Sequence, residues 1–438
     1  MRWLGVALIG LAACAAHAGH GTGEAPSSPL ALAAAPVAPV IRWPVRFAPA
    51  GEPADRYNEP QAEVPRTALG DAVTAAVRDA AVRAGLPAPR PDARLFRACA
   101  DLAELVPDHI AGGRLDDAVV EFALQRNGII EPAVHLLFGW GDLGAPGRFV
   151  DQLQPRLAQV LHDGAPSRLG VGVAQRLPDG TGAIVFAVQG SAVSTRPIPR
   201  AVPPDGDIAI DAVIDPRFHD PEVFVTDEHG DTRQVATRPG RPDGFVTEIA
   251  CRARHGRRQI EITASDASGA TVLANFPVWC AADPPRALTI DRMLDDAPPE
   301  DAADAERRLL ADINRDRAAA GLPDLIRDDA IAAVARGHAE DMRRTGAVAH
   351  VSATTGSAVD RLRAAGIRSR IVLENVARAY GVRDAHQALM SSPGHRANLM
   401  SAMATHVGVG VALGDEIGGR RELFITELFA AAVATARR

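Results

Sequence analysis

The stretch from Ala349 to Gly410 decides the fold of the C-terminal part of this chain, because four short blocks of polar residues and glycine follow one another in it. In order, the blocks read Ala349-His350-Val351-Ser352, Glu374-Asn375, Ser392-Pro393-Gly394-His395-Arg396-Ala397-Asn398-Leu399 and Thr405-His406-Val407-Gly408-Val409-Gly410. Ser392-Pro393 is typical of a helix start, with serine as N-cap and proline in the first turn. The stretch therefore predicts one structured domain that carries a polar site.

The residues around these blocks predict helices packed on an antiparallel sheet. Helical spacing of apolar residues is found at 304–320, after Asp328-Asp329, at 358–365 and at 384–390. Alternating apolar residues at 407–413 and at 423–425 predict two strands. A domain of the α+β class over residues 303–432 follows, with its helices layered on the sheet.

Together, the four blocks and these helices resemble the CAP domain, the family of cysteine-rich secretory proteins, antigen 5 and plant pathogenesis-related 1 proteins. The pattern is nearest to the bacterial branch, which has Trp-x-x-Ser-Pro-x-His-Arg-x-Asn, although Leu389 replaces the tryptophan. The resemblance covers roughly residues 303–430, the length of one domain. It implies the α-β-α sandwich of that family.

The resemblance also implies a candidate catalytic or binding site made of His350, Glu374 and His395, which we expect to meet in one open cleft. The second acid of the family's cluster is missing, because Ser392 stands at its position. Two imidazoles and a carboxylate can hold a divalent metal such as zinc, with His350 and His395 as ligands. They can equally form a hydrogen-bonded polar cluster, and the sequence leaves both alternatives open.

Two further polar residues have a smaller part in this prediction. His338 lies on the apolar stripe of its helix, so we expect a core histidine with a satisfied hydrogen bond. Glu427 lies in the last strand and belongs to the site only if the sheet brings it there.

Residues 66–190 repeat the spacing of the C-terminal domain without its polar residues. Gly128 and Gly170 are 42 residues apart, and so are Gly366 and Gly408. In this alignment leucine replaces three polar residues: Leu136 aligns with Glu374, Leu157 with His395 and Leu102 with His338, whereas His350 aligns with Gly112 or Arg114. We interpret residues 66–190 as a degenerate CAP-like α+β domain; the alternative is two unrelated alanine-rich helical domains.

Residues 191–285 show short alternating runs separated by turn residues, the pattern of an all-β sandwich of immunoglobulin-like type. Cys251 and Cys280 lie at the ends of two such runs, and we expect them to form a disulfide. Cys99 lies in a helical apolar pattern and is predicted to be a buried, inert thiol. Proline-rich composition predicts linkers at 19–65 and 286–302.

The N-terminus predicts export. Residues 1–18 have a basic start and a short apolar core, which is typical of a signal peptide. Leu11-Ala12-Ala13-Cys14 resembles a bacterial lipobox, which implies a lipid anchor at Cys14; cleavage after Ala18 is the alternative. No apolar stretch is long enough to span a membrane, so we expect attachment through lipid to the cell envelope (periplasm or outer membrane), or secretion.

Composition narrows the function further. The 438 residues carry a net charge of −7 with no basic run, which does not favour nucleic-acid binding. The sequence holds no nucleophile elbow, phosphate loop or His-Glu-x-x-His zinc motif. We therefore expect a protein that binds an unknown ligand or metal without catalysis. A metal-assisted or general-base hydrolase and a structural or adhesive scaffold are the alternatives.

Overall fold

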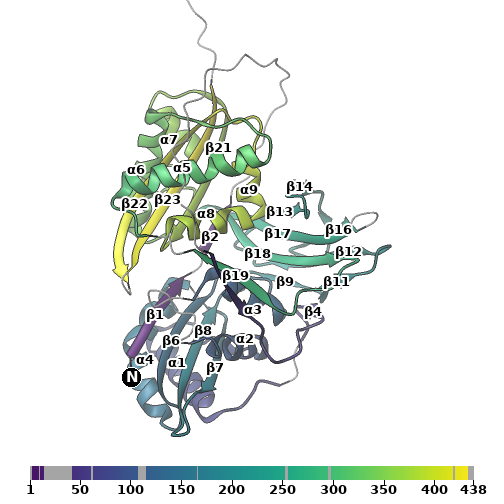
Figure 1. Cartoon of the computed structure of the whole chain (residues 1–438), viewed down its shortest axis with the longest axis vertical. Helices are drawn as coiled ribbons and strands as arrows, with labels where there is room; N and C mark the ends of the chain where they lie inside the picture. Colours follow the sequence, from purple (N-terminus) through teal and green to yellow (C-terminus); the bar gives the residue numbers. More distant parts are fainter. Residues whose placement is uncertain are drawn as a thin grey trace, which may run out of the picture.

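The structure is a computed structural model that describes residues 2–8, 10–13, 42–60, 63–106, 115–164, 166–251, 255–293, 297–417 and 420–432. Cys14, the proposed lipid site, lies outside the described residues, as does linker segment 19–41. Figure 1 shows an N-terminal domain and a C-terminal domain, each a sheet with helices, and a β-sandwich beside them.

The C-terminal domain has three layers, as the resemblance implies. Its sheet has the order β2-β21-β23-β22-β20, and it is antiparallel except for the β20–β22 pair. Apolar residues of α5 and α8 pack on one face, and those of α6 and α7 pack on the other. The elements are α5 (Ala302–Ala319), β20 (Ile326–Arg327), α6 (Asp329–Thr345), α7 (Ala358–Ala364), β21 (Ser369–Ala379), α8 (Val382–Ser391), α9 (Pro393–Leu399), β22 (His406–Ile417) and β23 (Arg420–Ala432), with β2 (Gly10–Ala13) at the edge.

The N-terminal domain has the same arrangement. Its sheet has the order β1-β6-β8-β7-β5, again antiparallel except for its last pair, β5 with β7. Helices α1 and α4 cover one face, and α2 and α3 cover the other. The elements are α1 (Ala68–Ala84), β5 (Arg90–Pro91), α2 (Ala93–Ala103), α3 (Asp117–Arg126), β6 (His135–Asp142), α4 (Pro146–Gly164), β7 (Arg168–Gln175) and β8 (Thr181–Gln189), with β1 (Arg2–Leu8) at the edge.

Glycines let one helix lie close against each sheet. A Cβ at Gly410 would lie 2.0 Å from the backbone nitrogen of Arg336 in α6. A Cβ at Gly172 would lie 2.1 Å from the backbone nitrogen of Ala100 in α2. Only glycine permits such an approach of two backbones, so the two domains use the same packing device at matching positions.

The strand pairing also matches the two domains residue by residue. Glu374 pairs with Leu428, which pairs with Gly408. In the N-terminal sheet Leu136 pairs with Ala187, which pairs with Gly170. Leu136 therefore occupies the position of Glu374, which is the alignment that the sequence predicts.

The β-sandwich consists of two sheets around one apolar core. One sheet has the order β15-β16-β12-β9 and the other has the order β11-β18-β17-β13-β14. The predicted disulfide is confirmed: Cys251 and Cys280, with Cα atoms 5.3 Å apart, join the end of β16 to the end of β18. Cys99 is buried and unpaired, as predicted. The strands are β9 (Val193–Thr195), β11 (Ala201–Val202), β12 (Asp207–Ile214), β13 (His219–Thr226), β14 (Thr232–Val235), β15 (Arg238–Pro239), β16 (Gly244–Ala250), β17 (Gly256–Asp266) and β18 (Gly269–Cys280).

Parts of both predicted linkers form paired strands in the structure. β3 (Arg42–Phe47) pairs with β19 (Leu288–Met293), and β4 (Arg56–Tyr57) pairs with β10 (Ile198–Pro199). Aromatic side chains anchor this segment, because Phe47 and Tyr57 are buried in two different cores. The hydroxyl of Tyr57 donates to the carbonyl of Pro277 at 2.6 Å. Proline content alone therefore did not identify a free linker here.

Residues 2–8 and 10–13, which belong to the predicted signal peptide, form edge strands in the structure. β1 pairs with β6 of the N-terminal sheet, and β2 pairs with β21 of the C-terminal sheet. Cleavage of the predicted signal peptide would remove β1 and β2 and leave these two sheet edges unpaired. The strand pairing in the structure and the signal-peptide prediction are therefore two different interpretations of residues 2–13.

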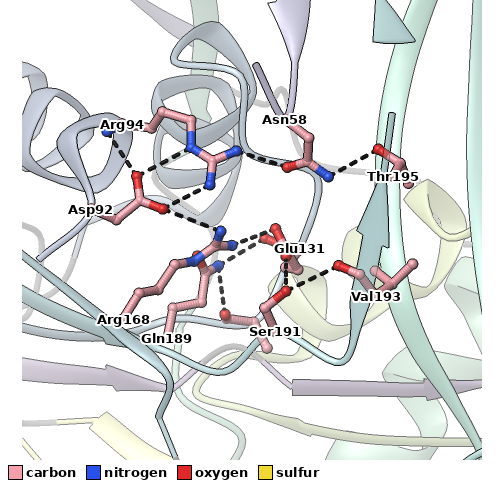
Figure 2. Close-up of polar contacts among 10 residues, drawn as sticks. Asn58, Asp92, Arg94, Glu131, Arg168, Gln189, Ser191, Val193 and Thr195 are labelled. Atoms are coloured by element: carbon pink, nitrogen blue, oxygen red, sulfur yellow. Dashed lines mark hydrogen bonds and ion pairs between the residues drawn. The ribbon is translucent and has the colours of Figure 1, made fainter. Parts of the chain in front are cut away.

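A buried ion-pair network fastens the N-terminal domain to the sandwich (Figure 2). Arg168 at the start of β7 pairs with Glu131, and its Nε donates to Gln189 at 3.0 Å. The hydroxyl of Ser191, just ahead of β9, donates to the other oxygen of Glu131 at 2.5 Å. Asp92, the N-cap of α2, lies 3.6 Å from Arg168. Each charge therefore has a partner, as a buried network requires.

The same network reaches the sandwich by a second route. Asp92 pairs with Arg94 at 2.7 Å, and Arg94 donates to the side chain of Asn58 at 2.8 Å. Asn58 in turn donates to the hydroxyl of Thr195 in β9 at 3.1 Å. Figure 2 shows these residues as one continuous chain of contacts.

Candidate functional site

His350 and Glu374, two of the three residues that the sequence predicts to meet, form a direct pair. His350 lies in the segment before α7, and its Nδ1 is 2.8 Å from Oε2 of Glu374 in β21. Each residue is only 3% exposed. Because a carboxylate accepts, Nδ1 carries the proton, and Nε2 of His350 is a buried atom without a hydrogen-bond partner in the described residues.

Arg361 completes this pair, and sequence reasoning missed it. Its guanidinium donates to Oε1 of Glu374, and it also donates to the carbonyls of His350 (3.2 Å) and Gly356 (2.6 Å). Burial opposes ionisation of Glu374, but the hydrogen bond from His350 and the charges of His350 and Arg361 outweigh it and lower its pKa. Glu374 is thus an ionised carboxylate with both oxygens engaged. An arginine in the helix directly after the first site histidine was the available signal.

His338 borders the pair from α6 and is a core histidine, but only one of its ring nitrogens has a hydrogen-bond partner in the described residues, since Nδ1 is buried without one. Its Nε2 donates to the carbonyl of Ala349 at 2.8 Å, and its side chain is buried. Burial lowers the pKa of His338, so it is a neutral imidazole near neutral pH.

His395 belongs to a second cluster that extends into the β-sandwich. Its Nδ1 is 2.6 Å from the hydroxyl of Ser392, the residue before α9. Ser392 donates to Oε2 of Glu261 in β17, and the N–H of Gly394 donates to Oε1 of Glu261 at 2.8 Å. Burial raises the pKa of Glu261 to about 7, although the bonds from Ser392 and Gly394 oppose this. The family's second acid is missing at position 392, but a glutamate from another domain reaches that position.

Ser392 does not cap α9 through its side chain, although it occupies the predicted N-cap position. Its hydroxyl is used by Glu261 and His395 instead. An N-cap hydroxyl normally accepts from the backbone of the helix it starts. The contact with the sandwich therefore replaces a local helix contact.

β21 separates the two clusters. Successive side chains of a strand point to opposite faces, so Glu374 faces α6 and α7 while Asn375 faces the other side. Asn375 donates to the carbonyl of His395 at 3.3 Å and to Glu427 of β23 at 3.0 Å. Asn398 of α9 donates to the carbonyl of Glu374 at 3.1 Å. The two amides thus link the His350–Glu374 pair to the helix that carries His395.

Glu427 is a third acidic group near these residues, after Glu374 and Glu261. It is fully buried, and its Oε1 has no hydrogen-bond partner in the described part of the chain. Burial raises its pKa to about 7, against the hydrogen bond from Asn375. The strand pairing of Glu427 with Asn375 corresponds to that of Phe186 with Leu137 in the N-terminal sheet. Apolar residues therefore occupy these polar positions in the first domain.

The expectation of an open cleft is wrong in this structure, because the sandwich covers the site. The N–H groups of His350 and Val351 both donate to the carbonyl of Ser268, at the tip of the β17–β18 hairpin. A Cβ at Gly269, which has φ +101, would lie 2.8 Å from Cβ of His350. His395 is 0% exposed. The segment that covers His350 is the turn of the β17–β18 hairpin, which lies far upstream in the sequence.

The residues present do not fit a metal centre. In the ranges that the structure describes, no three His, Cys, Asp or Glu side chains are arranged to hold a metal ion. Glu374 already has Arg361 on one oxygen and His350 on the other. To become a metal ligand, Glu374 would have to release the guanidinium of Arg361, and this leaves Nε2 of His350 as the free ring nitrogen of the pair. No step through zinc is therefore derived for this arrangement.

The layered fold and the His–Glu pair agree with the resemblance of the C-terminal domain to the CAP domain. Comparison with known families agrees, since residues 310–428 match the cysteine-rich secretory protein family, CAP. The match leaves the other two domains outside it.

Two Bacillus subtilis proteins are similar to part of this chain. YkwD, an uncharacterized protein, is 31% identical over 113 residues, which are 26% of this chain and 44% of YkwD. YlbC, an uncharacterized membrane protein, is 37% identical over 110 residues, which are 24% of this chain and 31% of YlbC. The chain thus spans less than half the length of either relative.

Solved structures that are similar to this chain include an extracellular protein with an SCP domain from Bacillus anthracis. It is 20% identical with a TM-score of 0.27, and the match covers 45% of this chain and 67% of that protein. A cysteine-rich secretory protein from Staphylococcus aureus is 11% identical with a TM-score of 0.25, covering 55% and 84%. Within the described residues, no helix has the length and apolar character needed to cross a membrane.

Proposed function

We propose that this chain is an exported, lipid-anchored CAP-domain protein of the bacterial cell envelope that binds a ligand and does not use a metal for catalysis. The observation that carries this proposal is the state of Glu374. Both of its oxygens are engaged, by Arg361 and His350, inside a covered cluster. A carboxylate held in this way orients its neighbours and is a poor metal ligand or general base.

The binding proposal is tested with the full chain. We expect ligand binding to persist in EDTA, with no turnover on panels of peptides, lipids and nucleic acids. His350→Ala/His395→Ala is the matched variant, and it should weaken binding while the protein stays folded. Turnover that EDTA abolishes would overturn the proposal. Unchanged function in the double variant would instead favour the structural or adhesive scaffold.

Export and anchoring rest on Leu11-Ala12-Ala13-Cys14. The mature protein should begin with a lipidated Cys14 and partition into detergent, and Cys14→Ser should abolish this. A soluble mature protein that begins at Gly19 would contradict the lipid anchor and support the alternative cleavage after Ala18.

One observation favours a hydrolase as the second candidate. The hydroxyl of Ser392 lies 2.6 Å from Nδ1 of His395, within the distance of a nucleophile and its base. However, the hydroxyl of Ser392 donates its proton to Glu261, whereas in the usual acid–histidine–serine order the serine donates to the histidine. Ser392 is also fully buried. We expect the unmodified protein and Ser392→Ala both to hydrolyse ester and peptide substrates only at the background rate. Hydrolysis by the unmodified protein that is lost in Ser392→Ala would establish the hydrolase.

We also propose that the N-terminal domain is a degenerate CAP-like copy that has kept its packing and lost its polar residues. The shared strand order and the matching positions of Leu136 and Glu374 support this. The sandwich between them, proposed to be immunoglobulin-like, then holds one copy with a polar site and one without.

A further inference from the structure

A pocket of about 440 Å³ lies where the sandwich meets the CAP domain. The turn between β13 and β14 and two residues of β17 form one wall, and the corner between α8 and α9 forms the other. Its volume is in the range of roughly 300–1,000 Å³ that is typical of small-molecule sites. Because each domain supplies one wall, the pocket exists only while the two domains are docked.

Two arginines line this pocket from opposite domains, Arg257 from β17 and Arg396 from α9. Arg396 donates from Nε to the carbonyl of Gly230 at 3.0 Å, and Arg257 donates to the amide oxygen of Gln259. Both partners are neutral. In the described ranges neither guanidinium has a carboxylate within ion-pair distance, and Glu121 attracts Arg257 only from farther away.

The acids of the pocket are already engaged elsewhere. Glu228 pairs with the buried guanidinium of Arg258 at 2.9 Å. Asp227 accepts the N–H groups of His229 at 3.0 Å and Asp231 at 3.1 Å, which close the β13–β14 turn. Neither carboxylate forms an ion pair with Arg257 or Arg396 in the described residues. The two guanidinium groups can therefore pair with an anionic ligand.

We propose that this interdomain pocket binds a small anionic ligand whose carboxylate or phosphate group is held between Arg257 and Arg396. A guanidinium presents a planar set of donors that suits both kinds of group. The inference rests on the proposed binding function and assigns it a location and a ligand class. A ligand held by both domains also stabilises their docking, by mass action.

The test is calorimetric titration of the full chain with inorganic phosphate, with citrate and with uncharged glucose, at low ionic strength. Saturable binding of phosphate or citrate, with none of glucose, is expected. The stronger of the two anions distinguishes a phosphate from a carboxylate ligand. Arg257→Gln and Arg396→Gln should each weaken binding roughly tenfold or more, since each removes charge-assisted hydrogen bonds.

Arg233→Gln is the matched control, because Arg233 is an exposed residue of the neighbouring strand β14 that does not line the pocket. It should bind as the unmodified protein does. Arg396→Lys keeps the charge without the planar donors and should show an intermediate affinity. Equal binding in all four variants, or no anion binding by the folded chain, would overturn the inference. If the chain binds a ligand in EDTA at another site, this inference is wrong but the proposed function is not. If the chain shows metal-dependent turnover, the proposed function is wrong but anion binding in this pocket is not.

Discussion

Ser392 of the CAP domain donates a hydrogen bond from its hydroxyl to the carboxylate of Glu261, which belongs to the β-sandwich. The same hydroxyl contacts His395, so one buried chain of polar groups runs from the candidate site into another domain. The N–H of Gly394 holds the second oxygen of Glu261. The state of Glu261 therefore affects both the site and the docking of the two domains.

We expect the docking of the sandwich on the CAP domain to weaken as the pH rises through about 7, the raised pKa of Glu261. The folded-state pKa lies above the ordinary value of 4.5, so the contribution of protonation is complete below about 4.5 and is lost as pH passes 7. The shift corresponds to about 3 kcal/mol between these limits. Hydrogen exchange of the β17 and α9 amides at pH 5.5 and 8.5 measures the effect.

Glu261→Gln should remove most of this pH dependence, because the amide does not ionise. Glu248→Gln is its control, since Glu248 is an exposed residue of the same sandwich with a side chain 66% exposed. The explanation fails if Glu261→Gln and the unmodified protein show the same difference in exchange between the two pH values.

Arg361→Gln should destabilise the CAP domain by roughly 3–5 kcal/mol, because it leaves the buried carboxylate of Glu374 without its cation. Urea unfolding at pH 7 measures this loss. Arg363→Gln, two residues along α7, is the control: its ion pair with Asp360 is exposed and should contribute less than about 1 kcal/mol. Similar losses in the two variants would show that the buried pair has no special role.

The His350–Glu374 pair could be predicted because the sequence motif places both residues within one known domain pattern. Glu261 could not be predicted. In Gln259-Ile260-Glu261-Ile262 the polar residues alternate with apolar ones, and this pattern indicates a strand with one face in solvent. The structure buries that face under α9 instead. The domain that covers a strand is decided by how the domains dock, and the alternation of polar and apolar residues within the strand does not show this.

The similar arrangement of the two domains could be predicted from the sequence because the spacing of their glycines is the same. The covering helix can contact the backbone of the sheet only where the strand has glycine, so the fold requires Gly172 and Gly410 at these positions. The ion-pair network of Arg168, Glu131 and Asp92 was missed, since single charged residues in a sequence do not show which of them meet in space.

Gly172→Ala and Gly410→Ala should each strongly destabilise their own domain. In both variants the new Cβ would lie about 2 Å from the backbone of the covering helix, so helix and sheet must separate. Gly337→Ala is the matched control within α6, because a Cβ there has no atom within 4 Å. Alanine is the better helix former, so this control should be stabilised by roughly 0.5–1 kcal/mol. Thermal unfolding of the three variants is the measurement. Tolerance of Gly410→Ala would contradict the close helix–sheet contact.

Glu427→Gln should make the protein more stable at pH 8.5 and have little effect at pH 5. The pKa of Glu427 is raised from 4.5 to about 7 by burial, so the carboxyl is neutral in the folded state at pH 5 and ionised at pH 8.5. Its described partner is the amide of Asn375, which does not compensate a buried charge. Because the pKa of this acid is higher in the folded than in the unfolded state, the free energy of unfolding falls by about 3 kcal/mol as the pH rises through 7. Urea unfolding of the variant, the unmodified protein and the exposed control Glu416→Gln at both pH values tests this.

Since Phe186 occupies the matching position in the N-terminal domain, the fold does not need an acid there. A gain in stability together with a loss of ligand binding would mean that Glu427 is kept for binding, and lower stability at pH 8.5 would refute the argument.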